Sequence, residues 1–256
     1  MPRLKEENAW RITPVLTGRF GMVRDDIRYR GGNPKITSYV PSVLFLLTGM
    51  NRQIVVDTGF GDRDLCEREL SLLVERDEPY ESIIERAGVM KEQVDTVILT
   101  HLHWDHAGMA EWFNGAVYCC HEAEWNRAAS HPDEYPPFWT EVFAENQKRL
   151  RLIRGTNRQE VAPGIWVQHV GGHTFGSMIV MVQTLTGLRV IAGDVVMTER
   201  NYKEDLPVGL CVDPGECEDA LRTIRALEPE KVYPSHDFSL FSQAVLQGTL
   251  SSGNRT

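Results

Sequence analysis

The chain has 256 residues, of which 42% are hydrophobic and 25% charged, a composition typical of a globular protein with a sizeable core. Its formal net charge of -9 at pH 7 argues against a nucleic-acid partner, because binding a phosphate backbone requires a basic surface. The sequence holds no apolar run of about 18 residues, so we expect no membrane partner.

The cysteines and the N-terminal residues indicate where the protein works. Five cysteines, an odd number without C-x-x-C spacing, favour reduced thiols over a disulfide framework. Residues 1–7 lack the apolar core of a signal peptide. We therefore expect a cytoplasmic protein. No low-complexity linker divides the chain, and a single domain over residues 1–256 is the economical interpretation.

Strands and helices alternate in the first half of the predicted structure. We expect strands over residues 10–16, 43–47, 53–56, 94–99 and 116–120, and helices over residues 63–76 and 79–87. The segment from residue 17 to Pro34 is rich in Gly, Arg and Asp and is expected to be a surface loop. The second and third strands form a predicted hairpin that ends in Asp57-Thr58-Gly59.

The second half repeats this order after a polar, aromatic segment, interpreted as a helical insertion around residues 121–155. Strands are then expected over residues 165–170, 178–182, 189–192 and 231–233, and a helix over residues 215–227. The hairpin of this half ends in Gly193-Asp194, as the first hairpin ends in Asp57. This weak internal repeat favours a duplicated α/β architecture of sheets covered by helices.

The most informative stretch is Thr-His-Leu-His-Trp-Asp-His-Ala-Gly at residues 100–108, which follows a predicted buried strand. If the strand geometry persists, His101 and His103 point to the same side, because side chains alternate with period two. A turn would bring Asp105 and His106 to a second, adjacent point. Nitrogen and carboxylate ligands so arranged suit zinc or a similar divalent metal.

Other polar residues follow predicted strands elsewhere in the chain. In such folds ligands collect at strand ends on one edge, so we expect a shared site there. The complete set is His101, His103, Asp105, His106, His173, Asp194 and His236. Five histidines and two aspartates suffice for two metals with open positions. The remaining histidines, His121, His131 and His169, are expected to be ordinary surface or core residues.

These motifs resemble the metallo-β-lactamase superfamily. The resemblance rests on H-x-H-x-D-H followed by Ala-Gly, on Gly-His-Thr-x-Gly-Ser at residues 172–177, on Gly193-Asp194 and on the strand-end His236. It covers the chain from residue 57 to residue 236 and implies an αββα sandwich. It also implies the metal ligands: His101, His103 and His173 for a first metal, Asp105, His106 and His236 for a second, and Asp194 as the bridge.

Two Zn²⁺ ions are the cofactors that the resemblance implies, with iron or manganese as alternatives. His103 stands where the superfamily's di-iron oxygen reductases typically have Glu, which favours zinc. Two divalent ions roughly 3.5–4 Å apart can share a water and lower its pKa towards neutrality. The resulting hydroxide would attack a carbonyl carbon, with Asp105 and Asp194 as catalytic residues. Asp57 is expected to hydrogen-bond a ligand histidine.

The layout of the chain narrows the choice within the superfamily. Glyoxalase II enzymes carry a helical domain after the last ligand, for which the twenty residues after His236 leave no room. Nucleic-acid-processing members generally need an added domain or a basic exosite, and this acidic chain shows neither. The layout is similar to that of the N-acyl homoserine lactone lactonases, the enzymes of quorum quenching, and of pyridoxolactonase-type enzymes. We expect a small-molecule lactone or related ester as substrate, and leave the oligomeric state open, a homodimer included.

One position departs from the lactonase pattern. Lactonases usually carry a Tyr three residues after the bridging Asp, and this chain has Met197 there. Tyr202 is expected to supply the catalytic hydroxyl instead if the loop folds back. Five aromatic or flexible apolar residues in loop-like contexts are expected to line an acyl-chain groove: Phe20, Met22, Tyr135, Phe138 and Trp139.

Alternatives to a lactonase stay open at this point. One is an iron-dependent sulfur dioxygenase of the same superfamily, with a single iron held by a subset of the ligands. Another is a hydrolase of a different ester or thioester. A third is a metal-stabilised binding protein, against which the carboxylate-containing ligand set argues, because structural zinc sites usually saturate with Cys and His.

Overall fold

The structure is a computed structural model that describes residues 9–70, 73–132, 135, 149–243 and 245–246. Within these residues the strands form two sheets, one of seven strands and one of five. Every described strand up to residue 153 belongs to the first sheet, and every described strand from residue 159 belongs to the second. The first part of the chain therefore forms the larger sheet, and the second part forms the smaller one.

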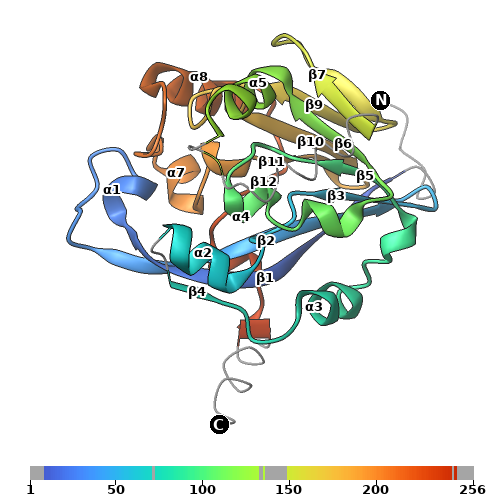
Figure 1. Ribbon diagram of the computed structural model, residues 1–256. Coiled ribbons are helices and arrows are strands. Elements are labelled where there is room, and N and C mark those ends of the chain that lie inside the picture. Colours follow the sequence, from blue (N-terminus) through green and yellow to red (C-terminus); the bar gives the residue numbers. More distant parts are fainter. Residues whose placement is uncertain (1–8, 71–72, 133–134, 136–148, 244, 247–256) are drawn as a thin grey trace.

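The larger sheet begins with a long antiparallel pair and ends with parallel strands (Figure 1). Its strands are β1 (Arg11–Arg24), β2 (Thr37–Gly49), β3 (Arg52–Val56), β4 (Leu73–Glu75), β5 (Val94–Ile98), β6 (Val117–His121) and β7 (Leu150–Ile153). They lie in the order β4-β1-β2-β3-β5-β6-β7. β3, β5, β6 and β7 run parallel, so their carboxyl ends share one edge.

The smaller sheet has the order β12-β11-β10-β9-β8. Its strands are β8 (Gln159–Ala162), β9 (Ile165–His169), β10 (Met178–Thr184), β11 (Gly187–Ile191) and β12 (Lys231–Tyr233). β9, β10 and β11 pair antiparallel, whereas β12 joins β11 in parallel. The segments that follow β11 and β12 therefore leave the sheet at the same edge.

The α-helices among the described residues are α1 (Asp25–Arg28), α2 (Arg63–Leu70), α3 (Tyr80–Arg86), α4 (Trp104–Ala107), α5 (Glu122–Ser130), α7 (Glu199–Lys203) and α8 (Pro214–Ala226). Short 3₁₀ turns are η2 (Lys91–Gln93), η3 (Ala110–Phe113), η6 (Gly193–Val195) and η7 (Phe238–Leu240). No helix among the described residues has both the length and the apolar character needed to cross a membrane.

The alternation of side chains along each strand separates the core into layers. Val180 and Val182 of β10 belong to the cluster between the two sheets, which also contains Phe45 of β2. Ile179 and Met181 belong to a different cluster, which contains the buried face of α8. The inner sheet faces therefore pack on each other, and α8 covers the outer face of the smaller sheet.

The outer face of the larger sheet is covered in the same way. Leu44 and Leu46 of β2 lie in a cluster with Ile83 and Ile84 of α3. The four layers are helix, sheet, sheet and helix, as the predicted αββα sandwich requires (Figure 1).

Local signals explain where α8 begins and which face it buries. The Asp213 side chain caps the helix by accepting hydrogen bonds from the backbone N–H groups of Gly215 and Glu216, and Pro214 occupies its first turn. The buried residues Cys217, Ala220, Leu221 and Ile224 have the spacing of one helical face. The helix predicted over residues 215–227 is thus confirmed.

Two predicted elements in the first half of the chain are wrong. β1 continues to Arg24, where a loop was expected, and its pairing with β2 has two register shifts that interrupt the expected alternation. The helix expected over residues 63–76 ends at Leu70, and β4 follows it and pairs with β1. Val74 is fully buried there. Pairing with the edge strand β1 therefore decides the structure of this segment, although its apolar residues have helical spacing.

Part of the predicted insertion around residues 121–155 can be described. It contains α5 and β7, and β7 extends the larger sheet beside β6. Phe138 and Trp139, two of the expected groove residues, lie outside the described residues. Because residues 133–134 and 136–148 lie outside the described residues, the boundaries of the insertion stay a prediction.

Candidate metal centre

Four segments bring the seven predicted ligands together. The segment after β5 carries four of them, the loop between β9 and β10 carries His173, η6 after β11 carries Asp194, and the residues after β12 carry His236. Their side chains form two groups in which every potential ligand atom lies within 4.8 Å of the others. Residues from both sheets contribute to each group.

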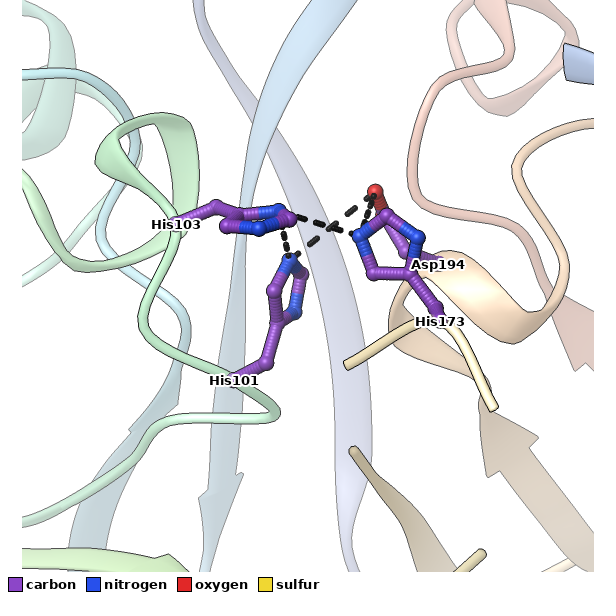
Figure 2. Close-up of side chains that lie close together, drawn as sticks. All are labelled: His101, His103, His173 and Asp194. Carbon is purple, nitrogen blue, oxygen red and sulfur yellow. Dashed lines mark hydrogen bonds and ion pairs between the residues drawn. The ribbon is translucent and has the colours of Figure 1, made fainter. Parts of the chain in front are cut away.

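The first cluster consists of His101, His103, His173 and Asp194 (Figure 2). The Nδ1 atom of His103 lies 3.1 Å from His101 Nε2 and 3.0 Å from His173 Nε2. Asp194 Oδ2 lies 3.3 Å from His173 Nε2 and 3.9 Å from His101 Nε2. Figure 2 shows the two loop histidines on one side of the centre and His173 with Asp194 on the other.

The second cluster consists of Asp105, His106 and His236. The Nε2 atoms of His106 and His236 lie 3.3 Å apart. Asp105 Oδ2 lies 3.6 Å from His106 Nε2 and 3.4 Å from His236 Nε2. Asp194 Oδ1 lies 3.1 Å from both Nε2 atoms. Because its Oδ2 faces the first cluster, Asp194 stands between the two.

The outer nitrogens of three histidines have acceptors that fix the tautomer. The Nδ1 atoms of His106, His173 and His236 lie 2.8, 2.7 and 2.9 Å from Asp57 Oδ2, the Leu210 carbonyl oxygen and the Pro41 carbonyl oxygen, respectively. Carbonyl and ionised carboxylate oxygens only accept, so in a neutral ring Nδ1 carries the proton and the Nε2 lone pair points inward. Lone pairs that converge at 3.3 Å repel unless a cation lies between them. The donor set therefore fits divalent metal ions.

The buried carboxylates make the centre favourable for positive charge, which a proton on His106 or a metal ion can supply. Burial alone would lower the pKa of His106, but the carboxylates of Asp194 and Asp105 outweigh it and raise this pKa well above its ordinary value. Burial alone would raise the pKa of Asp194, but the imidazoles of His236 and His106 outweigh it and lower this pKa well below its ordinary value. Burial and the neighbouring imidazoles lower the pKa of His101. The centre thus keeps an ionised carboxylate among buried nitrogen ligands.

Asp57 holds the segment that carries four ligands. Its Oδ1 accepts from the Thr100 backbone N–H at 2.8 Å, and its Oδ2 accepts from the Thr100 hydroxyl at 2.8 Å as well as from His106. The residue has a φ of 55°, in the left-handed region that Asp tolerates better than most residues. The hydrogen bond to a ligand histidine that was expected from the resemblance is present.

Gly193 allows the close approach of Asp194 to the other ligands. Its φ of 56° lies in the left-handed region, and a Cβ atom here would lie 2.8 Å from the Thr100 hydroxyl oxygen. The Gly-Asp pair at the end of β11 is therefore a steric requirement of the centre.

Aromatic residues expected near the substrate lie against ligand histidines. The ring of Phe20 stands edge-on to His236, with centroids 5.3 Å apart, and 5.0 Å from the ring of Trp104. The ring of Tyr135 lies 6.4 Å from that of His103. Met22, by contrast, is 52% exposed.

Met197 and Tyr202 lie on the segment that follows Asp194. The Met197 side chain is buried with Val208 and Cys217, and its carbonyl oxygen accepts from the His236 backbone N–H at 2.7 Å. Tyr202 packs against the cluster beneath α8, and the Arg225 guanidinium lies 4.6 Å from its ring centroid. In the part of the chain that the structure describes, no hydrogen bond or ring contact joins the Tyr202 phenol to the seven predicted ligands.

The three remaining histidines lie outside both clusters. His121 and His169 stack on each other with ring centroids 4.0 Å apart, and His131 is exposed at the end of α5.

The sequence interpretation missed a residue of a different kind, Glu124, whose carboxylate is fully buried and accepts from the Leu102 backbone N–H. Its spacing from Ala128, the other buried residue of α5, was the available signal.

Known proteins resemble this chain in sequence. Residues 39–236 match the sequence profile of the metallo-beta-lactamase superfamily. An N-acyl homoserine lactonase from Bacillus sp is 28% identical over 161 residues, which make up 62% of this chain and 62% of that protein. The N-acyl homoserine lactonase AiiB of Agrobacterium fabrum (strain C58 / ATCC 33970) is 28% identical over 129 residues, or 46% of each chain. The chain thus matches less than two thirds of the length of these relatives.

Solved structures resemble the fold over most of its length. An N-acyl homoserine lactone hydrolase with the product N-hexanoyl-L-homoserine bound at its catalytic metal centre has a TM-score of 0.75 and 21% identity, covering 89% of this chain and 93% of the other. AidC, a dizinc quorum-quenching lactonase, has a TM-score of 0.67 and 14% identity, covering 90% of this chain and 88% of the other. At these identities the likeness establishes the fold.

Proposed function

Because the chain belongs to the metallo-β-lactamase superfamily, we propose that it is a metal-dependent hydrolase that opens an N-acyl homoserine lactone or a related small lactone. The single observation that carries this proposal is the position of Asp194, with one carboxylate oxygen towards each histidine cluster. Such a bridged, carboxylate-containing ligand set is typical of a catalytic dinuclear centre rather than a closed structural site.

The residues divide into two metal sites in this proposal. The first site comprises His101, His103 and His173, the second comprises Asp105, His106 and His236, and Asp194 is shared. Zinc suits this mixture of imidazole and carboxylate ligands, with iron and manganese as the alternatives. When bound, two such ions supply an activated water of near-neutral pKa and polarise the carbonyl group of an ester.

The chain itself orients the ligands and handles a proton. Acceptors behind His106, His173 and His236 fix their rings, so that the ligand geometry exists before substrate arrives. Burial raises the pKa of Asp105, although the neighbouring His106 acts in the opposite direction. With its Oδ2 facing His106 and His236, the second carboxylate oxygen of Asp105 is suited to take the proton of the attacking water and to pass it to the ring oxygen when the C–O bond of the lactone breaks.

The surroundings of the centre are consistent with an apolar substituent on the substrate. Phe20 presents its ring beside His236, and Tyr135 lies beside His103. We assign these two rings to the wall of an acyl-chain groove. A catalytic hydroxyl from Tyr202 stays a prediction, as do the cytoplasmic location and the oligomeric state.

The test of the proposed function is acid release at constant pH by zinc-loaded protein. N-acyl homoserine lactones are compared with simple γ- and δ-lactones in the same experiment. Faster opening of homoserine lactones is the expected result and would indicate that Met197 is tolerated. Turnover of the simple lactones alone would mean a changed substrate. If no lactone opens, the hydrolase of another ester or thioester and the iron-dependent sulfur dioxygenase become the hypotheses to test, the latter by iron content and oxygen uptake.

A further inference from the structure

The two loops that supply the first cluster come from different sheets and need a connection. Residues 101–103 follow β5 of the larger sheet, and His173 lies in the loop before β10 of the smaller sheet. Figure 2 shows that the ligands approach one another from opposite sides. The Met178 backbone N–H donates to the Thr100 carbonyl oxygen at 2.9 Å and joins the flanks of the two loops, but the parts that carry the ligands need a further contact to fix their distance.

Glu124 of α5 contacts both loops. Its Oε1 accepts a hydrogen bond from the Leu102 backbone N–H at 3.1 Å, and its Oε2 accepts one from the Gly176 backbone N–H at 2.8 Å. The Tyr135 hydroxyl donates to Oε1 at 3.5 Å. Each carboxylate oxygen thus serves a different loop, and the side chain is fully buried, with an exposed fraction of 0%.

These contacts lie directly beside the metal ligands. Leu102 stands between His101 and His103, so the orientation of its peptide group influences both neighbours. Gly176 belongs to a turn that closes on itself, because the Ser177 hydroxyl accepts from the Thr174 backbone N–H at 3.0 Å. His173 immediately precedes this turn, and Glu124 fixes the turn to α5.

The close approach of α5 to this turn depends on glycine at position 176. A Cβ atom there would lie 2.3 Å from the Cβ atom of Glu124 and 2.5 Å from its backbone nitrogen. No side chain fits in that space. The backbone N–H of Gly176 can therefore reach the carboxylate only because residue 176 has no side chain.

We propose that Glu124 is a positioning residue that sets the distance between the His101–His103 pair and His173 by holding both loops through one buried carboxylate. It deepens the proposed function, since it rests on the metal centre of that proposal. A carboxylate can only accept, and here it satisfies two N–H donors at once. An amide in its place would turn its NH₂ group towards one of them and release that loop.

The experiment measures metal binding rather than turnover. Zinc affinity is obtained by competition with a chromophoric chelator, and the geometry of the first site from the visible spectrum of the Co²⁺-loaded protein. We expect Glu124→Gln to weaken zinc binding at least tenfold and to change the Co²⁺ spectrum. Glu122→Gln is the matched control, because Glu122 lies on the same helix and makes an exposed ion pair with Arg154. It should leave both measurements unchanged.

An unchanged zinc affinity and Co²⁺ spectrum for Glu124→Gln would overturn the proposal, even if the melting temperature fell, because the residue would then serve folding alone. If circular dichroism shows that this variant does not fold, Glu124→Asp tests the same contact with the charge kept, because its shorter side chain cannot reach both the Leu102 and the Gly176 N–H groups. It should also weaken zinc binding, and wild-type affinity would again refute the proposal.

The two proposals can fail separately. A wild-type protein that binds zinc but opens no lactone would refute the proposed substrate and leave the Glu124 comparison decisive. A wild-type protein that binds no divalent metal would overturn both.

Discussion

Asp194 is the residue that the two clusters share, since its carboxylate oxygens face different sets of imidazoles. We expect Asp194→Ala to reduce lactone turnover by more than a hundredfold, because losing a ligand should exceed the ten- to hundredfold effect of losing an outer hydrogen-bond partner. Metal analysis should show fewer than two zinc ions per chain. Asp219→Ala, which removes an exposed carboxylate of α8, is the control. Full activity with two zinc ions in the Asp194 variant would contradict this role.

A substitution of Asp57 tests how much metal binding depends on the orientation of the His106 ring. We expect Asp57→Asn to lower zinc affinity or activity ten- to hundredfold, because the amide cannot serve all the donors that the carboxylate serves now. Asn tolerates a positive φ as well as Asp does, so backbone strain should not change. Asp205→Asn is a matched control, since Asp205 has a φ of 58° but lies on the surface. Equal losses in both variants would point to the backbone instead.

At the residue scale, the sequence predicted the ligands because they follow strands and cluster in a short motif. His101, His103, Asp105 and His106 need only one strand and one turn to come together. Glu124 could not be predicted in this way. Its partners lie 22 and 52 residues away, and its burial depends on how α5 docks against two loops. The spacing of Glu124 from Ala128 indicates a shared helical face, but no local pattern identifies its partners in the two loops.

The N-terminus of α5 offers a pH-dependent contribution to stability. His121 caps this helix, because its Nδ1 accepts from the Ala123 backbone N–H at 3.2 Å. Burial, together with the stacked His169, lowers the pKa of His121 below its ordinary value. The folded protein therefore binds fewer protons here than the unfolded chain. The contribution of the neutral His121 ring to the free energy of unfolding is fully present above about pH 6.5, the pKa in the unfolded chain. It is lost as the pH falls from there through the lowered pKa of the folded protein.

We expect His121→Asn to lose less stability than the wild type between pH 7 and pH 5, because Asn keeps the cap without titrating. Melting temperatures of both zinc-loaded proteins across this range provide the measurement. Parallel curves for the two proteins would show that His121 does not titrate in this range.

Arg76 joins the end of β4 to two other segments. Its guanidinium donates to the carbonyl oxygens of Thr17 in β1 at 2.9 Å and of Gly61 at 3.3 Å, and to that of Phe60. We expect Arg76→Met to lower stability by about 1–3 kcal/mol, because buried carbonyl groups lose their donor. For a chain of this size, that corresponds to a fall in melting temperature of roughly 2–12 °C. Arg63→Met removes an exposed guanidinium of α2 and should have little effect by comparison.

At the element scale, the predicted hairpins and α8 are confirmed because alternation and capping are local signals. β4 was missed because its three residues form a strand only where β1 offers an open edge. β1 was predicted too short because its register shifts break the period of two. These errors arise where the partner strand, and not the local sequence, decides the structure.

The metal centre should stabilise the whole molecule, because each cluster draws ligands from both sheets. With free zinc at a thousand times its dissociation constant, linkage gives about 4 kcal/mol of added stability. We expect a chelator to lower the melting temperature by roughly 8–16 °C and added zinc to restore it. Identical melting temperatures with and without metal would argue that the sheets hold together without the centre.

At the scale of the whole molecule, the αββα arrangement was anticipated through the resemblance of the motifs. Composition and periodicity alone predicted only sheets covered by helices. The match over residues 39–236 and the solved structures support the more specific architecture. How the sheets pair face to face depends on long-range packing, which no local pattern encodes.

The separation of the sheets along the chain has a practical consequence. The turn around Gly155, between β7 and β8, is exposed and joins the last strand of one sheet to the first of the other. A break there would yield two fragments, neither of which carries a complete metal cluster. Zinc should then strengthen the reassembly of these fragments, which also share the apolar core between the sheets, so that a split version of the protein would give a signal that rises with metal concentration.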